Sequence, residues 1–96
     1  MGVHFLPETV IVAAKDQVSC NLGPEAAVLN VKNGIYYGLD PIGAEVWKLL
    51  QKPQRVSEIS DAILSEYDVE QEVWERDLQT LLEHLHAEGL IVVQTS

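Results

Sequence analysis

The chain is poor in cysteine and in basic residues. Its 96 residues include one cysteine, Cys20, and six Lys and Arg against fifteen Asp and Glu, which gives a net charge of −9. A single cysteine excludes a framework of internal disulfides and is typical of a reducing cytoplasm. No apolar run approaches the roughly 20 residues that a membrane helix needs, and the N-terminus lacks the basic and apolar regions of a secretory signal. We therefore expect a cytoplasmic protein with no membrane partner.

The acidic charge is concentrated in the second half of the chain. Between positions 57 and 88 there are ten carboxylates and one basic residue, Arg76. The carboxylates are Glu58, Asp61, Glu66, Asp68, Glu70, Glu72, Glu75, Asp77, Glu83 and Glu88. Because nucleic-acid binding through phosphates needs a basic face, we expect no nucleic-acid partner. The acidic surface is a solvated helix face, a surface that attracts a cationic partner, or both.

The first forty residues have the composition of strands and turns. Residues 9–14 (TVIVAA) are rich in β-branched side chains and predict a strand. Residues 15–25 contain loop-forming residues and predict a connection. Residues 26–31 and Ile35–Leu39 predict the two strands of a hairpin.

The register of this hairpin follows from the alternation of side chains. A three-residue loop over residues 32–34, with Gly34 left-handed, pairs Leu29 with Tyr37 and gives one wholly apolar face. A two-residue loop would mix polar and apolar side chains on both faces. We therefore expect the three-residue loop.

Two helices are predicted after the hairpin. Asp40 and Pro41 are the residue types preferred at the N-cap and at the first helical position. Apolar residues then recur at helical spacing until Pro53 ends the run. Ser57 can cap a second, shorter helix.

A third helix is the longest. Asp68 or Glu70 can open it, and Gly89 stands where a glycine commonly ends a helix. Its apolar stripe consists of Trp74, Leu78, Leu81 and Leu85, with Leu82 alongside. We expect Trp74 to belong to the core, and residues 90–94 to pack back as a short strand or tail.

This order of elements predicts an α+β fold. We expect a winged-helix-like arrangement, with a three-stranded antiparallel sheet followed by a three-helix bundle, in one domain with its core over about residues 9–94. The third helix would stand where a helix-turn-helix protein reads DNA, but it carries carboxylates in place of base-reading side chains. DNA binding is therefore not expected.

The sequence offers no credible catalytic or metal site. His84 and His86 are two residues apart on a helix and point about 200° apart, so they cannot share a tetrahedral metal ion. Cys20 has no basic neighbour that would activate its thiol. We expect no catalytic residue, no metal and no cofactor.

Ile35–Leu39 is predicted to be an edge strand, with no Lys or Pro to block further pairing. Either a helix or the C-terminal tail covers this edge, or an extended peptide adds to it as a fourth strand. The second alternative predicts a peptide-binding protein.

Three segments carry a resemblance to a known family. Residues 34–47 are GIYYGLDPIGAEVW, residues 55–59 are RVSEI, and residues 77–91 are DLQTLLEHLHAEGLI. In this order they resemble the PqqD-like peptide-recognition elements of ribosomal-peptide modification (RiPP recognition elements), in particular the stand-alone members of lasso-peptide biosynthesis.

The resemblance implies a non-catalytic protein that binds the leader peptide of a ribosomally made precursor. The leader would add to the third strand in the cleft beside the third helix, for delivery to a separate Cys leader peptidase and a lasso macrocyclase. The implied peptide-binding residues are Ile35, Tyr36, Tyr37, Gly38 and Leu39 on the strand, and Val73, Asp77, Thr80, Leu81 and His84 on one flank of the helix.

Three questions remain open on the sequence alone. The opposite flank of the helix, with Glu75 and Leu82, could instead face the cleft. The protein could be a PqqD-type peptide chaperone for a radical-SAM enzyme. It could also be a winged-helix adaptor with a closed groove, whose protein partner binds the acidic face.

Overall fold

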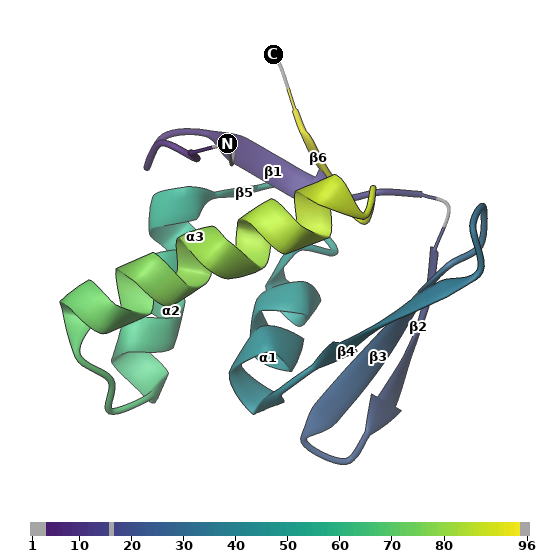
Figure 1. The fold of residues 1–96 in the computed structure, drawn as a ribbon. Coiled ribbons are helices and arrows are strands. Elements are labelled where there is room, and N and C mark those ends of the chain that lie inside the picture. Colours follow the sequence, from purple (N-terminus) through teal and green to yellow (C-terminus); the bar gives the residue numbers. More distant parts are fainter. Residues whose placement is uncertain (1–3, 16, 95–96) are drawn as a thin grey trace.

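The structure is a computed structural model that describes residues 4–15 and 17–94. Three helices lie against two small sheets, with α3 running across α1 and α2 (Figure 1). In chain order the elements are β1 (Val10–Ala13), β2 (Gln17–Leu22), β3 (Glu25–Asn30), β4 (Ile35–Leu39), α1 (Pro41–Leu49), β5 (Gln54–Arg55), α2 (Val56–Glu66), α3 (Gln71–Ala87) and β6 (Ile91–Val93).

Both sheets are three-stranded and antiparallel. One has the order β2-β3-β4 and the other the order β5-β1-β6. The predicted α+β class, with a three-stranded antiparallel sheet and three helices, is confirmed. The sequence did not predict the second sheet, in which β1 is the central strand and β6 packs back against it.

The predicted loop over residues 15–25 is wrong, because β2 occupies most of it. β2 pairs with β3 from Gln17↔Asn30 to Leu22↔Glu25, and Gly23 makes the connecting turn with φ 72°. The residues of β2 beyond Gln17 are all exposed. Loop-type side chains are tolerated there, because the strand is held by backbone pairing and not by burial.

The hairpin register also differs from the prediction by one residue. Asn30 pairs with Ile35 and Val28 with Tyr37, so that residues 31–34 form the loop. Gly34 is left-handed as predicted, with φ 71°. The inner face of β3 therefore carries Asn30 with Val28 and Ala26, and not the wholly apolar set.

The buried amide of Asn30 explains this shift. Its Nδ2 donates to the carbonyl of Glu88 at 2.7 Å, and its Oδ1 accepts from the backbone N–H of Lys32 at 3.0 Å. A buried polar group costs little when it is hydrogen-bonded. The polar residue can therefore occupy the core face, which the apolar pattern alone had excluded.

Local capping sets the start of α1 as predicted. Asp40 is the N-cap and Pro41 the first helical residue; the Asp40 carboxylate accepts from the N–H of Gly43 at 2.7 Å. The prediction for α2 is wrong, because its N-cap is Arg55 and not Ser57. Tertiary contacts move this start, since the N–H of Ser57 donates to the carbonyl of Pro7 at 2.9 Å.

The longest helix, α3, ends as predicted. Its N-cap is Glu70, and Gly89 follows its C-terminus with φ 71°. The N–H groups of Gly89 and Leu90 donate to the carbonyls of His86 and Leu85, which is a Schellman end.

One hydrophobic core joins the helices to both sheets. From α3 it takes Trp74, Leu78, Leu82 and Leu85, so Trp74 is a core residue as predicted, whereas Leu81 is only partly buried. The remaining core residues are Phe5, Ile11, Ala26, Val28, Leu39, Val46, Trp47, Leu50, Val56, Ile59, Ile63, Leu90 and Ile91. The core fixes α3 beside β4 and leaves one flank of the helix facing that strand.

Candidate peptide-binding cleft

β4 is an edge strand, as the sequence predicted. It pairs with β3 on one side only, and β6 pairs with β1, so β6 does not cover it. An edge strand presents unpaired N–H and C=O groups of alternate residues along its free side. Figure 1 shows β4 between β3 and the helices, so its unpaired side faces the helices. The candidate cleft is the space between this strand and α3 that the sequence predicts.

A contact between Tyr37 and His84 joins the two walls of the cleft. The Tyr37 hydroxyl lies 3.1 Å from His84 Nδ1, and the two rings meet edge to face with centroids 6.4 Å apart. The pKa of the Tyr37 phenol is raised, first by partial burial and then by the negative charges of Glu88 and Asp40. The phenol is therefore neutral at physiological pH and holds this contact without a charge.

A second hydrogen bond holds the sheet to the same end of α3. Asn30 on β3 donates to the carbonyl of Glu88, just beyond the helix. Together with the contact between Tyr37 and His84, it fixes the C-terminal half of α3 against the β2-β3-β4 sheet. These two contacts bridge the sheet and this end of α3.

A hollow of about 170 Å³ lies between the start of α1, which directly follows β4, and α3. Its lining is mostly apolar, with two carboxylates. The lining residues are Asp40, Ile42, Gly43, Val69, Val73, Trp74, Asp77 and Leu81. Such a lining can receive an apolar side chain from a peptide that lies along β4.

Trp74 forms part of the hollow and belongs to the core. It is 4% exposed, and its Nε1 has no hydrogen-bond partner among residues 4–15 and 17–94. A buried donor without an acceptor is costly and is normally satisfied in some state of a protein. Because Nε1 itself is inaccessible, it faces the core and not the hollow.

The structure brings together most of the side chains proposed from the sequence. Val73, Asp77 and Leu81 line the hollow, and His84 contacts Tyr37. Thr80 is exposed and does not line the hollow; its hydroxyl donates to the carbonyl of Arg76 at 3.2 Å. The other flank of α3, including Glu75, borders a separate cavity on the far side of the helix.

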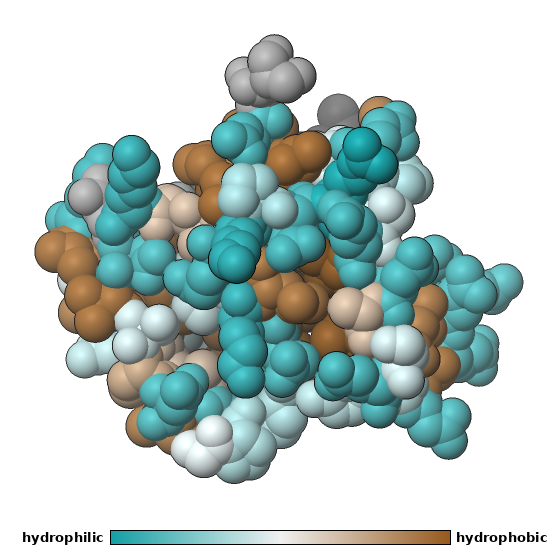
Figure 2. Space-filling model, turned by 180° about the vertical axis from the view of Figure 1, so that it is seen from behind, coloured by the Kyte–Doolittle hydropathy of each residue, from teal (hydrophilic) through white to brown (hydrophobic). Residues whose placement is uncertain are grey.

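The side chains of β4 divide between the two faces of the sheet. Leu39 is buried and Tyr37 half-buried toward α3, whereas Tyr36 is 70% exposed. Tyr36 lies opposite Leu29, and Leu29 lies opposite Val18, so these three share the outer face. Seen from behind, the surface of the molecule shows scattered hydrophobic areas among hydrophilic ones (Figure 2). Tyr36 and Gly38 can therefore contribute only their backbone to the cleft.

The sequence analysis missed the contribution of α1 to the hollow. Gly43 lies in the first turn, where a Cβ atom would stand 3.1 Å from the Asp40 carboxylate and 3.3 Å from Leu39 Cδ2. A glycine just after an Asp-Pro cap is unfavourable in a helix unless something packs closely against it. Gly43 was therefore the sequence feature that could have predicted close packing at the start of α1.

Among the residues that the structure describes, no group of three or more His, Cys, Asp or Glu could hold a metal ion. No helix within residues 4–15 and 17–94 has the length and hydrophobicity needed to cross a membrane.

Two solved structures are similar to this chain. One is TbiB1 in complex with the TbiA(beta) leader peptide, with 34% sequence identity and a TM-score of 0.78; the match covers 88% of this chain and 99% of that chain. The other is lasso peptide synthetase B1 complexed with the leader peptide, at 21% identity and a TM-score of 0.73 over 85% of this chain and 96% of that chain. At 21% identity, the match to lasso peptide synthetase B1 shows a similarity of fold alone.

The family comparison agrees with the structural ones. None of the curated proteins compared with the chain matches it. The model of coenzyme PQQ synthesis protein D (PqqD) matches residues 25–91, which run from β3 through α3 to the start of β6. The resemblance found in the sequence is thus confirmed, and the chain belongs to the PqqD family of peptide-recognition elements.

Proposed function

We propose that this protein binds the leader peptide of a ribosomally made precursor and performs no catalysis of its own. The leader lies antiparallel to β4 as an added strand, in the cleft between β4 and α3. The observation that carries the proposal is the unpaired edge of β4 beside an apolar hollow on α3. An edge and a pocket together are what peptide recognition by strand addition needs.

The similar structures support the same ligand class. Each is described as a complex with a leader peptide, and the TbiB1 complex is 34% identical over most of both chains. The precursor is therefore that of a lasso peptide. After binding, the protein delivers it in the cytoplasm to a separate Cys leader peptidase and a macrocyclase, with about residues 9–94 acting as one domain.

The hollow supplies most of the binding free energy. A backbone hydrogen bond contributes about 0.5–1.5 kcal/mol net, whereas ordering one residue of the leader costs roughly 1–2 kcal/mol. The free energy gained from strand pairing alone is therefore nearly cancelled by the cost of ordering the leader. One apolar side chain buried against Val73 and Leu81 adds about 1.5–3 kcal/mol, which produces a stable complex.

A scan of N-methylated leader peptides tests strand addition without changing the protein. Each synthetic leader, taken from the precursor gene beside this one, carries one N-methyl group, and its affinity is measured by calorimetry. In an added strand only alternate N–H groups point to β4, so affinity should fall at every second position over the paired segment. Losses without this alternation, or none at all, would rule out strand addition.

A PqqD-type chaperone for a radical-SAM enzyme is the alternative that the family match favours. It would use the same cleft and a different precursor. The two differ in their neighbouring genes and in the leader that binds. Binding of a leader encoded beside a radical-SAM enzyme, with no binding of a lasso leader, would replace the lasso assignment and leave the cleft unchanged.

A further inference from the structure

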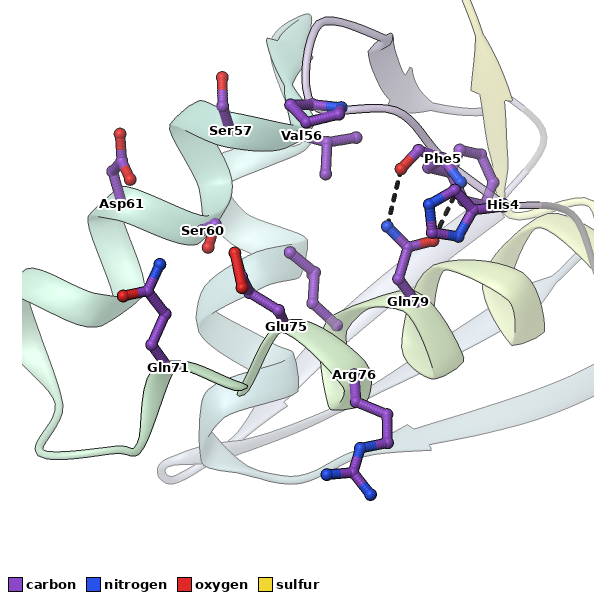
Figure 3. Close-up of a pocket in the computed structure, with 12 residues that line it drawn as sticks. His4, Phe5, Val56, Ser57, Ser60, Asp61, Gln71, Glu75, Arg76 and Gln79 are labelled. Carbon is purple, nitrogen blue, oxygen red and sulfur yellow. Dashed lines mark hydrogen bonds between the residues drawn. The ribbon is translucent and has the colours of Figure 1, made fainter. Parts of the chain in front are cut away.

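A second cavity, of about 540 Å³, lies on the opposite side of α3 from the cleft. Figure 3 shows it between α2, α3 and the N-terminal segment. Its apolar floor and walls include Phe5, Val56 and Leu78, all of them core residues. Its polar residues include Ser60, Asp61, Gln71 and Glu75.

The N-terminal wall of this cavity is firmly held. Gln79 on α3 accepts the N–H of Phe5 at 2.9 Å and donates to the Phe5 carbonyl at 2.7 Å, as a neighbouring strand would. Phe5 is 2% exposed, and its ring meets His86 edge to face at 5.8 Å. The cavity is therefore bounded by packed core on this side.

The backbone donors at the start of α2 are already used. The N–H of Val56 donates to the carbonyl of Thr9 at 3.0 Å, and that of Ser57 to the carbonyl of Pro7 at 2.9 Å. A helix N-terminus commonly binds anions through such groups. Here they are not free, so the cavity is poorly suited to a phosphate or a carboxylate.

The polar lining includes hydrogen-bond acceptors next to the side chains of His4, Gln71 and Arg76. Ser60 is only 8% exposed, and its hydroxyl has no hydrogen-bond partner in the part of the chain that the structure describes. In Figure 3 this hydroxyl and the Glu75 carboxylate point into the same space, whereas the Arg76 guanidinium points away from it. Asp61 adds a second carboxylate to the lining. This arrangement, in a chain of net charge −9, favours a cationic group.

We propose that this cavity is a docking site for a protein partner that inserts an arginine side chain next to an apolar residue. The apolar residue packs on Leu78 and Val56. The guanidinium is planar and donates several hydrogen bonds in a fixed fork, which suits the Glu75 carboxylate and the Ser60 hydroxyl. Because α3 separates this cavity from the cleft, the partner and the leader occupy opposite flanks of one helix.

Two small peptides test the chemistry directly. Acetyl-Phe-Arg-amide and acetyl-Phe-citrulline-amide are nearly isosteric, but only the first is cationic. We expect the arginine peptide to bind about tenfold more tightly, because it forms charge-assisted hydrogen bonds, and to shift the amide signals of α2 and the first half of α3 in NMR spectra. Equal affinities, or shifts elsewhere, would overturn the proposal.

Two matched variants test whether the Glu75 carboxylate is the group that recognises the arginine. Glu75→Gln should abolish most of the preference for arginine over citrulline. Glu72→Gln removes an exposed carboxylate from the same helix outside the cavity, and should leave the preference intact. The same loss in both variants would assign the effect to net charge and overturn the site.

The test is independent of leader binding. The arginine peptide should bind equally well with and without a saturating leader peptide. Displacement by the leader would show that one ligand uses both flanks of α3, which overturns a separate partner site. If the leader does not bind at all, the function proposed for the cleft fails and the cavity proposal stands on its own data.

Discussion

The hydroxyl of Tyr37 on β4 lies 3.1 Å from Nδ1 of His84 on α3, across 47 positions in the sequence. It is the one side-chain hydrogen bond found between these two elements in residues 4–15 and 17–94. Along α3 it lies between the Asn30–Glu88 hydrogen bond and the hollow lined by Val73 and Leu81. If the leader pairs with β4 as proposed, we expect its apolar anchor at the hollow end.

The Tyr37 phenol should titrate at higher pH in the folded than in the urea-unfolded protein, because burial and nearby carboxylates raise its pKa. Folding then favours the protonated phenol. This contribution to stability is complete below the unfolded pKa and is lost as the pH rises through the folded pKa. NMR of ring-labelled tyrosine follows the titration, and Glu88→Gln should move it partly back. A folded pKa at or below the unfolded one would contradict this cause.

Gly38→Pro should abolish leader binding, because proline removes an N–H from β4 and restricts its backbone. Gly38→Ala is the matched control. A Cβ at this position meets nothing within 4 Å, so alanine should bind nearly as well as the native protein. Calorimetry gives the affinities and circular dichroism confirms the fold. Undiminished affinity in a folded proline variant would be evidence against pairing along β4.

Leu81→Asp should weaken leader binding by at least about 2 kcal/mol, because it puts a charge in the apolar hollow. Thr80→Ala, one residue away but outside the hollow, should change affinity little. An alanine scan of the leader should then find one or two positions that each cost more than about 2 kcal/mol. Small, even losses along the leader would instead indicate that the backbone carries the binding.

Association with a basic partner should slow as salt rises, if the acidic surface attracts it. Eight of the ten carboxylates between positions 57 and 88 are exposed, all except Glu83 and Glu88. The Debye length falls from about 10 Å at 0.1 M salt to about 3 Å at 1 M, which removes long-range attraction. Stopped-flow rates measure this. Rates that do not change with salt would leave solvation as the role of the charge.

The boundaries of α1 and α3 could be predicted from the sequence, because local chemistry sets them. Asp40 caps its helix through an N–H only three residues away, and Gly89 ends α3 by a left-handed turn that other residues rarely adopt. The edge position of β4 also followed from residue order, whereas helical periodicity left open which flank of α3 faces this strand. These features depend on neighbours in the chain.

The tertiary structure decided what depends on partners far away in the sequence. Asn30 lies on the core face because a carbonyl 58 residues away accepts its amide proton, and this changed the register of the hairpin. α2 begins before Ser57 because the N-terminal segment accepts its first N–H groups. β2 forms because β3 pairs with its backbone. A sequence pattern records which side chains are apolar, but it does not record which distant backbone group will satisfy a polar one.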